Sequence, residues 1–331
     1  MSDEIICWAR LLMATMALSE AGSLLITVPD KRLVWAVFVV VACQSLARAQ
    51  FTDPRTYDNS PVAINQLTLG YGFAHANASI DSSLVISGAK LDLNVGVLDY
   101  TRSVNFLRRY AWIEASLPIA GLAGAVTGTT LQGSVTGAGD STYVFGALLK
   151  GAPALSLQEF STYDPTTTFG VSVTVTAPTG SYDANRVLNL GSDRWSFKPE
   201  IAVSHPFGPN HNWEVDGYAN AYFFTNNTSY HGREILRQEP ITGFEGHLSY
   251  SFTSNVWASV DARYALRGDT LVDGGDQQNS QQDVTVGSEV NVSLSPRHSL
   301  VFLFAKSVVY RNAPASTTSG IKYTFTWGKG Y

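Results

Sequence analysis

Charged side chains recur at every second position in several segments of this chain, with apolar side chains between them. Glu245 and His247, for example, alternate with Phe244 and Leu248. In an extended strand, successive residues point to opposite faces, so such a segment has one charged face and one apolar face. The apolar face suits lipid, because a Lys or Arg side chain at the bilayer midplane costs about 2–4 kcal/mol. The charged face would then line a water-filled interior, where charge selects among solutes.

Eleven ionisable residues share this expected inward position on their strands. They are Glu114, Lys198, Glu200, Glu214, Asp216, Glu245, His247, Asp261, Arg263, Glu289 and Lys322. Acidic residues outnumber basic ones in this set. We therefore expect an acidic lumen that favours cations.

Motifs of the common hydrolases and metalloenzymes are absent from the sequence. It has no G-x-S-x-G elbow, no H-E-x-x-H, no P-loop and no Cys/His spacing typical of metal sites. His247 is the best-placed histidine for a Ser/His site at a barrel rim, and the alternative is a lumen histidine paired with a carboxylate. Residues 273–276 (DGGD) could form a loop cation site or the polar tip of a hairpin. We expect no enzyme, no cofactor and no bound metal.

The inward residues belong to a pattern that repeats from Asn65 to Trp327. About ten residues alternate between apolar and polar, and a turn or polar loop follows, as in transmembrane β-barrels. The pattern predicts an all-β fold, a single antiparallel up-and-down barrel of about twelve strands. The predicted strands are 65–76, 89–101, 108–118, 140–149, 167–177, 195–205, 213–225, 241–252, 256–267, 282–294, 299–310 and 319–328.

Short and long connections alternate along these strands, as periplasmic turns and extracellular loops do in outer-membrane barrels. A soluble Greek-key protein has no reason to alternate in this way. With an even strand count, both ends of the barrel chain lie in the periplasm. Residues 150–166 are long where a short turn is expected, and we expect a brief helix there. The short connections are 102–107, 206–212, 253–255 and 295–298, and the long ones are 77–88, 119–139, 178–194, 226–240, 268–281 and 311–318.

The short connection 253–255 predicts how its two strands pair. A three-residue loop places Phe252 opposite Val256, and that register brings two inward pairs face to face. Directly opposed side chains lie about 4.5–5.5 Å apart at Cβ, close enough for ion pairs. We interpret both pairs as contributions to fold stability rather than to transport. The pairs are His247 with Asp261, and Glu245 with Arg263.

A secretory leader precedes the strands. The basic pair 31–32 is followed by the apolar run 33–42 and by Ala-Arg-Ala at 47–49. These features are typical of a signal peptide, and we expect cleavage after residue 49. The chain then divides into an extension with signal peptide at 1–49 and an outer-membrane barrel at 50–331.

Both cysteines, Cys7 and Cys43, lie in this leader. Residues 40–43 loosely fit a lipoprotein signal, so lipidation of Cys43 is the alternative to cleavage after residue 49. An exported barrel without cysteines depends on backbone hydrogen bonding or a large core instead of disulfides. A closed barrel provides the first of these, because every strand is paired.

Two sequence blocks are characteristic: residues 177–183 read APTGSYD, and residues 188–200 read LNLGSDRWSFKPE. With these blocks, most of the chain beyond the leader resembles the MetA-pathway phenol-degradation family of outer-membrane transporter-like proteins. The resemblance implies a barrel, and the family's name implies uptake of aromatic compounds. It supplies no substrate-binding residues. Shorter similar stretches are 53–55, 137–140, 151–156, 223–226 and 256–259.

We therefore expect a bacterial outer-membrane channel or facilitator for the passive uptake of small, hydrophobic or aromatic solutes. Its partners would be membrane lipid and the solute. The net charge of −5 does not suggest nucleic acid. No plug domain is visible ahead of the first strand, so we expect no energy-coupling partner. The alternatives are a barrel enzyme acting on lipids, with a Ser/His/carboxylate group at its rim, and a structural or adhesive barrel whose lumen is filled by side chains.

Overall fold

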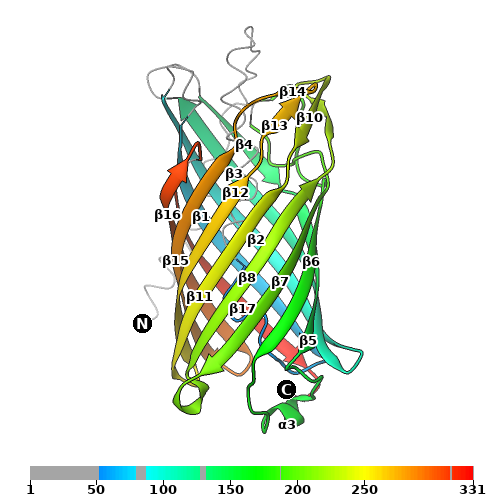
Figure 1. The fold of residues 1–331 in the computed structure, drawn as a ribbon, viewed down its shortest axis with the longest axis vertical. Helices are drawn as coiled ribbons and strands as arrows, with labels where there is room; N and C mark the ends of the chain where they lie inside the picture. The colour runs from blue at the N-terminus through cyan, green and yellow to red at the C-terminus, as the bar shows by residue number, and fades with distance from the viewer. Residues whose placement is uncertain (1–51, 80–86, 127–131, 187, 314, 331) are drawn as a thin grey trace, which may run out of the picture.

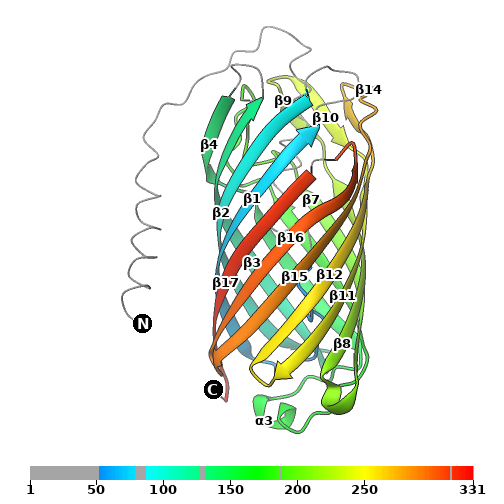
Figure 2. The same ribbon diagram turned by 90° about the vertical axis from the view of Figure 1, so that its left-hand side faces the viewer.

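The computed structural model describes residues 52–330, apart from 80–86, 127–131, 187 and 314. The expected signal peptide, its cleavage site and Cys43 lie outside these residues. The described chain forms one barrel that is taller than it is wide (Figure 1). Strands cross its wall at a common tilt, and the two views agree on this arrangement (Figure 2).

Twelve antiparallel strand positions make up the barrel wall. Each strand pairs with the strand before it and the strand after it, and β1 pairs with β17 to close the sheet. The fourth position consists of two strands, β4 and β5, which both pair with β3. The wall strands are β1 (Ile64–Ser79), β2 (Ser87–Phe106), β3 (Arg109–Val126), β4 (Gln132–Ala138), β5 (Ser141–Lys150), β6 (Thr168–Ala177), β7 (Ser196–Phe207), β8 (Trp213–Phe224), β11 (Ile241–Thr253), β12 (Val256–Arg267), β15 (Gln281–Ser295), β16 (His298–Arg311) and β17 (Ala315–Gly328).

Each of the twelve predicted strands coincides with an observed one, which confirms the predicted fold class. The predicted long loops 119–139 and 311–318 are wrong, because β3 and β4 occupy most of the first and β17 begins inside the second. In both places the backbone ladder continues beyond the length needed to cross a bilayer. The residues there are mostly small or polar, so they extend a paired hairpin without requiring lipid.

The predicted register between β11 and β12 is confirmed over most of its length, from Ile241 opposite Arg267 to Ser251 opposite Trp257. The predicted contact of Phe252 with Val256 is wrong. Val256 pairs with Thr253, and the register shifts at this point. A bulge near Phe252 therefore accompanies a two-residue turn, a combination that fits the strong twist of hairpin ends.

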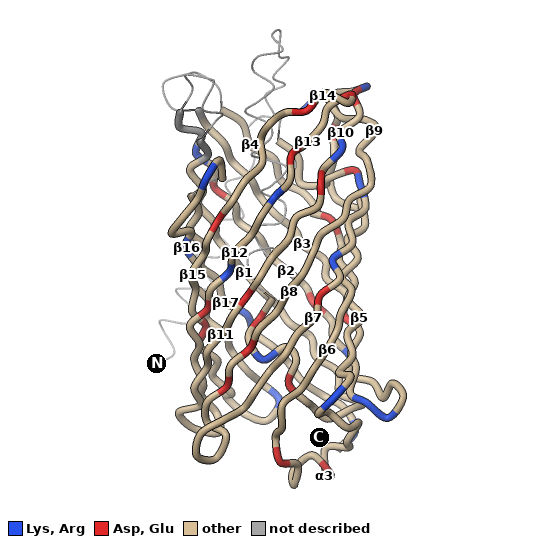
Figure 3. The backbone as a smooth tube through the Cα atoms, in the orientation of Figure 1, with Lys and Arg blue, Asp and Glu red and all other residues tan. Residues whose placement is uncertain are grey.

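The two faces of the wall differ as the alternation predicts. Outward side chains are apolar and exposed: Ile201, Phe252 and Val260 each expose more than half of their surface. Charged residues of the wall strands such as Glu200, Asp216 and Arg263 are buried, and other charged residues lie at the two ends of the barrel (Figure 3). The apolar outer surface matches the hydrocarbon core of a membrane.

The two ends of the barrel carry different additions (Figure 1). At the end expected to face the periplasm, residues 150–166 contain the single-turn helix α3 (Leu157–Phe160), which confirms the expected brief helix. Ser156 and Glu159 form a capping box at its start. Among the described residues, no helix is long and apolar enough to cross a membrane.

The opposite end carries a small four-stranded sheet. It turns at residues 273–274, both with positive φ, so the DGGD stretch is the tip of a hairpin. Asp273 accepts a hydrogen bond from a backbone amide, as expected for a structural turn residue. The strands are β9 (Asn227–Tyr230), β10 (Glu234–Gln238), β13 (Thr270–Val272) and β14 (Gly275–Asp276).

Candidate functional site

Residues 52–60, which precede β1, lie inside the barrel and form the first part of the site. We call them the N-terminal segment. Tyr57 in the middle of this segment is fully buried. The sequence showed no plug domain, and this short stretch has no strand or helix pattern of its own. It nevertheless occupies part of the lumen, which sequence reasoning missed.

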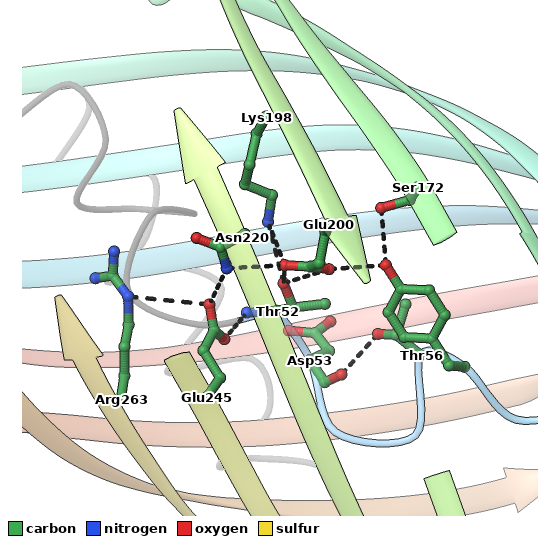
Figure 4. Close-up of polar contacts among 10 residues, drawn as sticks. Thr52, Asp53, Thr56, Ser172, Lys198, Glu200, Asn220, Glu245 and Arg263 are labelled. Carbon is green, nitrogen blue, oxygen red and sulfur yellow. Dashed lines mark hydrogen bonds and ion pairs between the residues drawn. The ribbon is translucent and has the colours of Figure 1, made fainter. Parts of the chain in front are cut away.

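The N-terminal segment begins against two carboxylates of the wall (Figure 4). The Thr52 amide donates to Glu245 Oε2 at 2.6 Å, and its hydroxyl donates to both oxygens of Glu200 at 2.9 and 3.1 Å. The Tyr57 hydroxyl donates to Glu200 Oε1 at 2.8 Å. Charge-assisted hydrogen bonds of this kind are stronger than neutral ones, so these wall carboxylates hold the segment in place.

The same two carboxylates are balanced by cationic and amide groups of the wall (Figure 4). Lys198 Nζ lies 3.0 Å from Glu200 Oε2, and Arg263 Nε lies 3.9 Å from Glu245 Oε1. The Asn220 amide donates to both carboxylates at 3.0 Å. The predicted pairing of Glu245 with Arg263 is confirmed. Four strands, β7, β8, β11 and β12, thus share one polar network that we call the polar wall.

Arg55 attaches the N-terminal segment to strand β11 of the polar wall. Its Nε donates to the Ser249 hydroxyl at 2.8 Å, and its Nη2 donates to the Ser251 hydroxyl at 3.1 Å. The guanidinium carbon lies 4.9 Å from the ring centroid of Trp257, within the range of a cation–π contact. A further tether joins Asp53 to Lys322 Nζ at 2.5 Å.

Tyr57 packs into an aromatic pocket in the lumen. Its ring centroid lies 5.4 Å from that of Trp112 and 5.1 Å from that of Tyr218. Two inward glycines make room for these rings. A Cβ on Gly170 would lie 2.4 Å from Tyr57 Cδ1, and a Cβ on Gly146 would lie 2.1 Å from Trp112 Cζ2. Glycine at inward strand positions is the sequence signal that could have indicated a bulky occupant.

Burial changes the ionisation of Asp58 in the segment. Desolvation, with a smaller contribution from the nearby Asp216 carboxylate, raises the pKa of Asp58 from its usual value to about 6. A hydrogen bond with Glu214 and the nearby Arg55 act in the opposite direction but are outweighed. The segment therefore brings a third carboxyl group to a part of the polar wall that already carries Glu214 and Asp216.

The other side of the lumen is apolar. Buried side chains from β1, β2, β3 and β4 form a continuous cluster toward the end of the barrel that carries the small sheet. Leu190, from the connection between β6 and β7, packs into it. We call this surface the apolar wall. Its buried members are Ala74, Ala76, Leu91, Leu93, Val95, Ala120, Leu122, Val135 and Leu190.

Asp140 holds the 178–195 connection over this wall. It accepts hydrogen bonds from the Gly180 amide at 2.9 Å and from the Ser192 amide and hydroxyl at 2.8 and 2.6 Å. Burial raises the pKa of the Asp140 carboxyl, although these bonds act in the opposite direction. The characteristic block 188–200 thus supplies both a piece of the apolar wall and two residues of the polar network.

A cavity of about 860 Å³ lies between the two walls. Val95, Val97 and Phe304 are among its apolar lining residues, and Lys198 and Arg263 are among its charged ones. The N-terminal segment forms part of its lining, since residues 52–60 all contribute to it. The lumen is therefore neither empty nor filled completely.

The structure places the eleven sequence-predicted residues at the lumen in two groups. Glu214, Asp216, Glu245 and His247 are buried in the polar wall, and the first three contact the N-terminal segment. The others line the cavity: Glu114, Lys198, Glu200, Asp261, Arg263, Glu289 and Lys322. Whether they act in transport remains a prediction.

His247 occupies the position expected for a structural histidine. Its Nδ1 lies 2.7 Å from Asp261 Oδ1, which confirms the predicted pair. Its ring lies beside Tyr218 within the polar wall. Ser259 donates its hydroxyl to Asp261 Oδ2 at 3.1 Å. The serine thus contacts the carboxylate of the pair, whereas a catalytic serine transfers its proton to the imidazole.

Comparisons with known proteins agree with this architecture. The model of the family described as "Putative MetA-pathway of phenol degradation" matches residues 72–323. The COG4313 outer membrane channel from Pseudomonas putida F1 superposes with a TM-score of 0.72 at 21% sequence identity, covering 84% of this chain and all of the channel. Among curated protein sequences, none matches.

Two further barrels resemble the chain more weakly. The NanC porin has a TM-score of 0.45 at 8% identity, covering 78% of this chain and 98% of the porin. The CymD monoaromatic hydrocarbon channel has a TM-score of 0.44 at 9% identity, covering 82% of this chain and 90% of CymD. A closed barrel with an apolar outer surface and this family membership is a protein of the bacterial outer membrane.

Proposed function

Because the chain belongs to the MetA-pathway phenol-degradation family, we propose that it is a passive outer-membrane channel for small hydrophobic or aromatic solutes. The observation that carries the proposal is the apolar wall. A lumen built only for ions or sugars gains nothing from a continuous cluster of Leu, Val and Ala. Burying apolar solute surface there is favourable by roughly 25 cal/mol per Å².

The size of the cavity is consistent with such a solute. Pockets for small molecules measure about 300–1,000 Å³, and the cavity measures about 860 Å³. The N-terminal segment occupies lumen space and thereby limits the size of what can pass. A solute the size of phenol would find apolar side chains such as Val95 and Val97 and charged side chains such as Lys198 in the lining of this cavity.

The residues around the cavity support passage rather than catalysis. Many charged groups of the polar wall are engaged with one another or with the N-terminal segment, as Glu200 and Glu245 illustrate. Passive flow down a gradient requires weak binding that permits release. We propose no reaction and no energy-coupling partner for this barrel.

Uptake assays on proteoliposomes test the proposal. We expect the protein to accelerate entry of phenol and similar aromatics more than entry of pentoses. Replacing Val95 and Val97 by Thr keeps their shape and adds hydroxyls, and should slow phenol entry about threefold to tenfold. The matched control is Val144→Thr, at a cavity-lining position outside the apolar cluster, which should change entry less than about twofold. Equal rates for phenol and pentoses in the native protein would contradict the proposal.

A further inference from the structure

Three carboxyl groups converge where the N-terminal segment meets β8. Asp58 comes from the segment, and Glu214 and Asp216 come from the strand. One oxygen of each residue lies within 4.8 Å of the corresponding oxygens of the other two. Glu214 exposes 6% of its surface and Asp216 2%. The two strand carboxyl groups are therefore shielded from water, whereas Asp58 is only partly buried and borders the cavity.

Among the described residues, Arg55 is the cation that contacts this group, and it balances only part of the charge. Arg55 Nε lies 3.7 Å from Glu214 Oε2, and the Arg55 amide donates to Asp216 Oδ2 at 3.2 Å. His247 on β11 also lies near, but it is paired with Asp261. With all three carboxyl groups ionised, one arginine leaves two negative charges. Buried uncompensated charge is costly.

Two carboxylate oxygens of this group lack a hydrogen-bond partner among the described residues, which indicates a bound ligand. Glu214 Oε1 and Asp216 Oδ1 are buried, and within the part of the chain that the structure describes neither receives a hydrogen bond of good geometry. The Ser204 hydroxyl lies beside Asp216 without forming such a bond to Oδ1. Buried carboxylate oxygens almost always have a partner. A bound cation or a proton shared between Asp58 and Glu214 can supply this partner, and the titration below distinguishes the two.

The dimensions and charge fit a hard divalent cation. Calcium binds carboxylate oxygens at about 2.3–2.6 Å, so its ligands lie up to about 5 Å apart. A charge of +2 would balance the two negative charges that Arg55 leaves. We propose that Asp58, Glu214 and Asp216 form a calcium-class cation site that ties the N-terminal segment to β8. The site does not depend on which solute crosses the barrel.

Calcium titration of the full chain tests this site. The protein is refolded into detergent, because co-purified lipopolysaccharide would itself bind calcium, and isothermal titration calorimetry is run at pH 8. We expect one ion per chain. Asp58→Asn should weaken binding at least about tenfold, which is about 1.4 kcal/mol. Asp53→Asn is the matched control. It removes the same charge from the same segment but contacts Lys322, and it should change affinity less than about twofold.

Each outcome of the calcium titration supports or contradicts the proposed site. If the native protein takes up no calcium at about 5 mM, above the range of weak extracellular sites, protons rather than a metal neutralise the group and the proposal fails. The proposal also fails if Asp58→Asn binds like the native protein. Should Asp58→Asn not fold, Glu214→Gln makes the same test from the strand side. Phenol uptake can succeed or fail independently of these results.

Discussion

The two walls of the lumen arise from the same strand alternation, but their side chains make different contacts. On the polar wall, inward side chains are buried against one another and against the N-terminal segment, as in the pair of Glu245 with Arg263. On the apolar wall, inward side chains such as Val95 pack together and border the cavity. We infer that charge inside this barrel helps to hold the N-terminal segment in place, and that the apolar wall is the surface that a hydrophobic solute would contact.

We expect the largest effect from removing the N-terminal segment, which the polar wall holds in place. Deleting residues 52–58 would eliminate the contacts of Thr52, Arg55 and Tyr57 and open the lumen across its width. We expect single-channel conductance to rise at least about fivefold, because a wider aqueous path conducts more ions. Planar-bilayer recordings measure this. An unchanged conductance would show that the narrowest point lies elsewhere.

The matched control for that deletion is Asp53→Asn. It weakens the ion pair with Lys322 and keeps Tyr57 and its pocket in place. We expect its conductance to stay within about twofold of the native value.

Arg263→Ala tests whether a charge of the polar wall is structural. The side chains of Arg263 and Glu245 each expose only 3% of their surface, and removing one partner of a buried pair costs about 3–5 kcal/mol. We expect the lower end of that range, about 3 kcal/mol, because the lumen admits some water. Urea unfolding in lipid vesicles measures the loss. A large change in conductance with unchanged stability would instead make the pair part of the transport path.

Gly170→Ala tests the fit of Tyr57 against the wall. The new Cβ would lie 2.4 Å from Tyr57 Cδ1, so the ring must move, and overpacking of this kind costs about 1–3 kcal/mol. Gly217→Ala is the control, because its Cβ would meet only Val203 Cγ1, at an ordinary 3.6 Å. A shift of the urea midpoint in the first variant and not in the second would show that this position is tightly packed, by Tyr57 and by Leu148, whose Cδ2 lies 2.7 Å from the new Cβ. Equal midpoints would contradict it.

Strand alternation was enough to predict the barrel and part of its interior. Period two identifies twelve strands, and the loop at 253–255 gives the register that pairs His247 with Asp261. The N-terminal segment could not be predicted in this way, because it has no periodicity and is held by side chains about 150–200 residues away in the sequence. Two features of the sequence hinted at the N-terminal segment. They are the inward glycines 146 and 170 and the similarity of residues 53–55 to the family.

The smallest predicted effect concerns ion selectivity. The eleven inward residues include more acids than bases, and Asp53 and Asp58 against Arg55 make the lumen more acidic. A reversal potential in a salt gradient should therefore show cation preference, by about twofold over anions, because most of these charges are paired. Calcium at the Asp58 site should lower the preference further. Clear anion preference would contradict the inward placement of these carboxylates, and a strong cation preference would mean that fewer of them are neutralised than the contacts of the polar wall indicate.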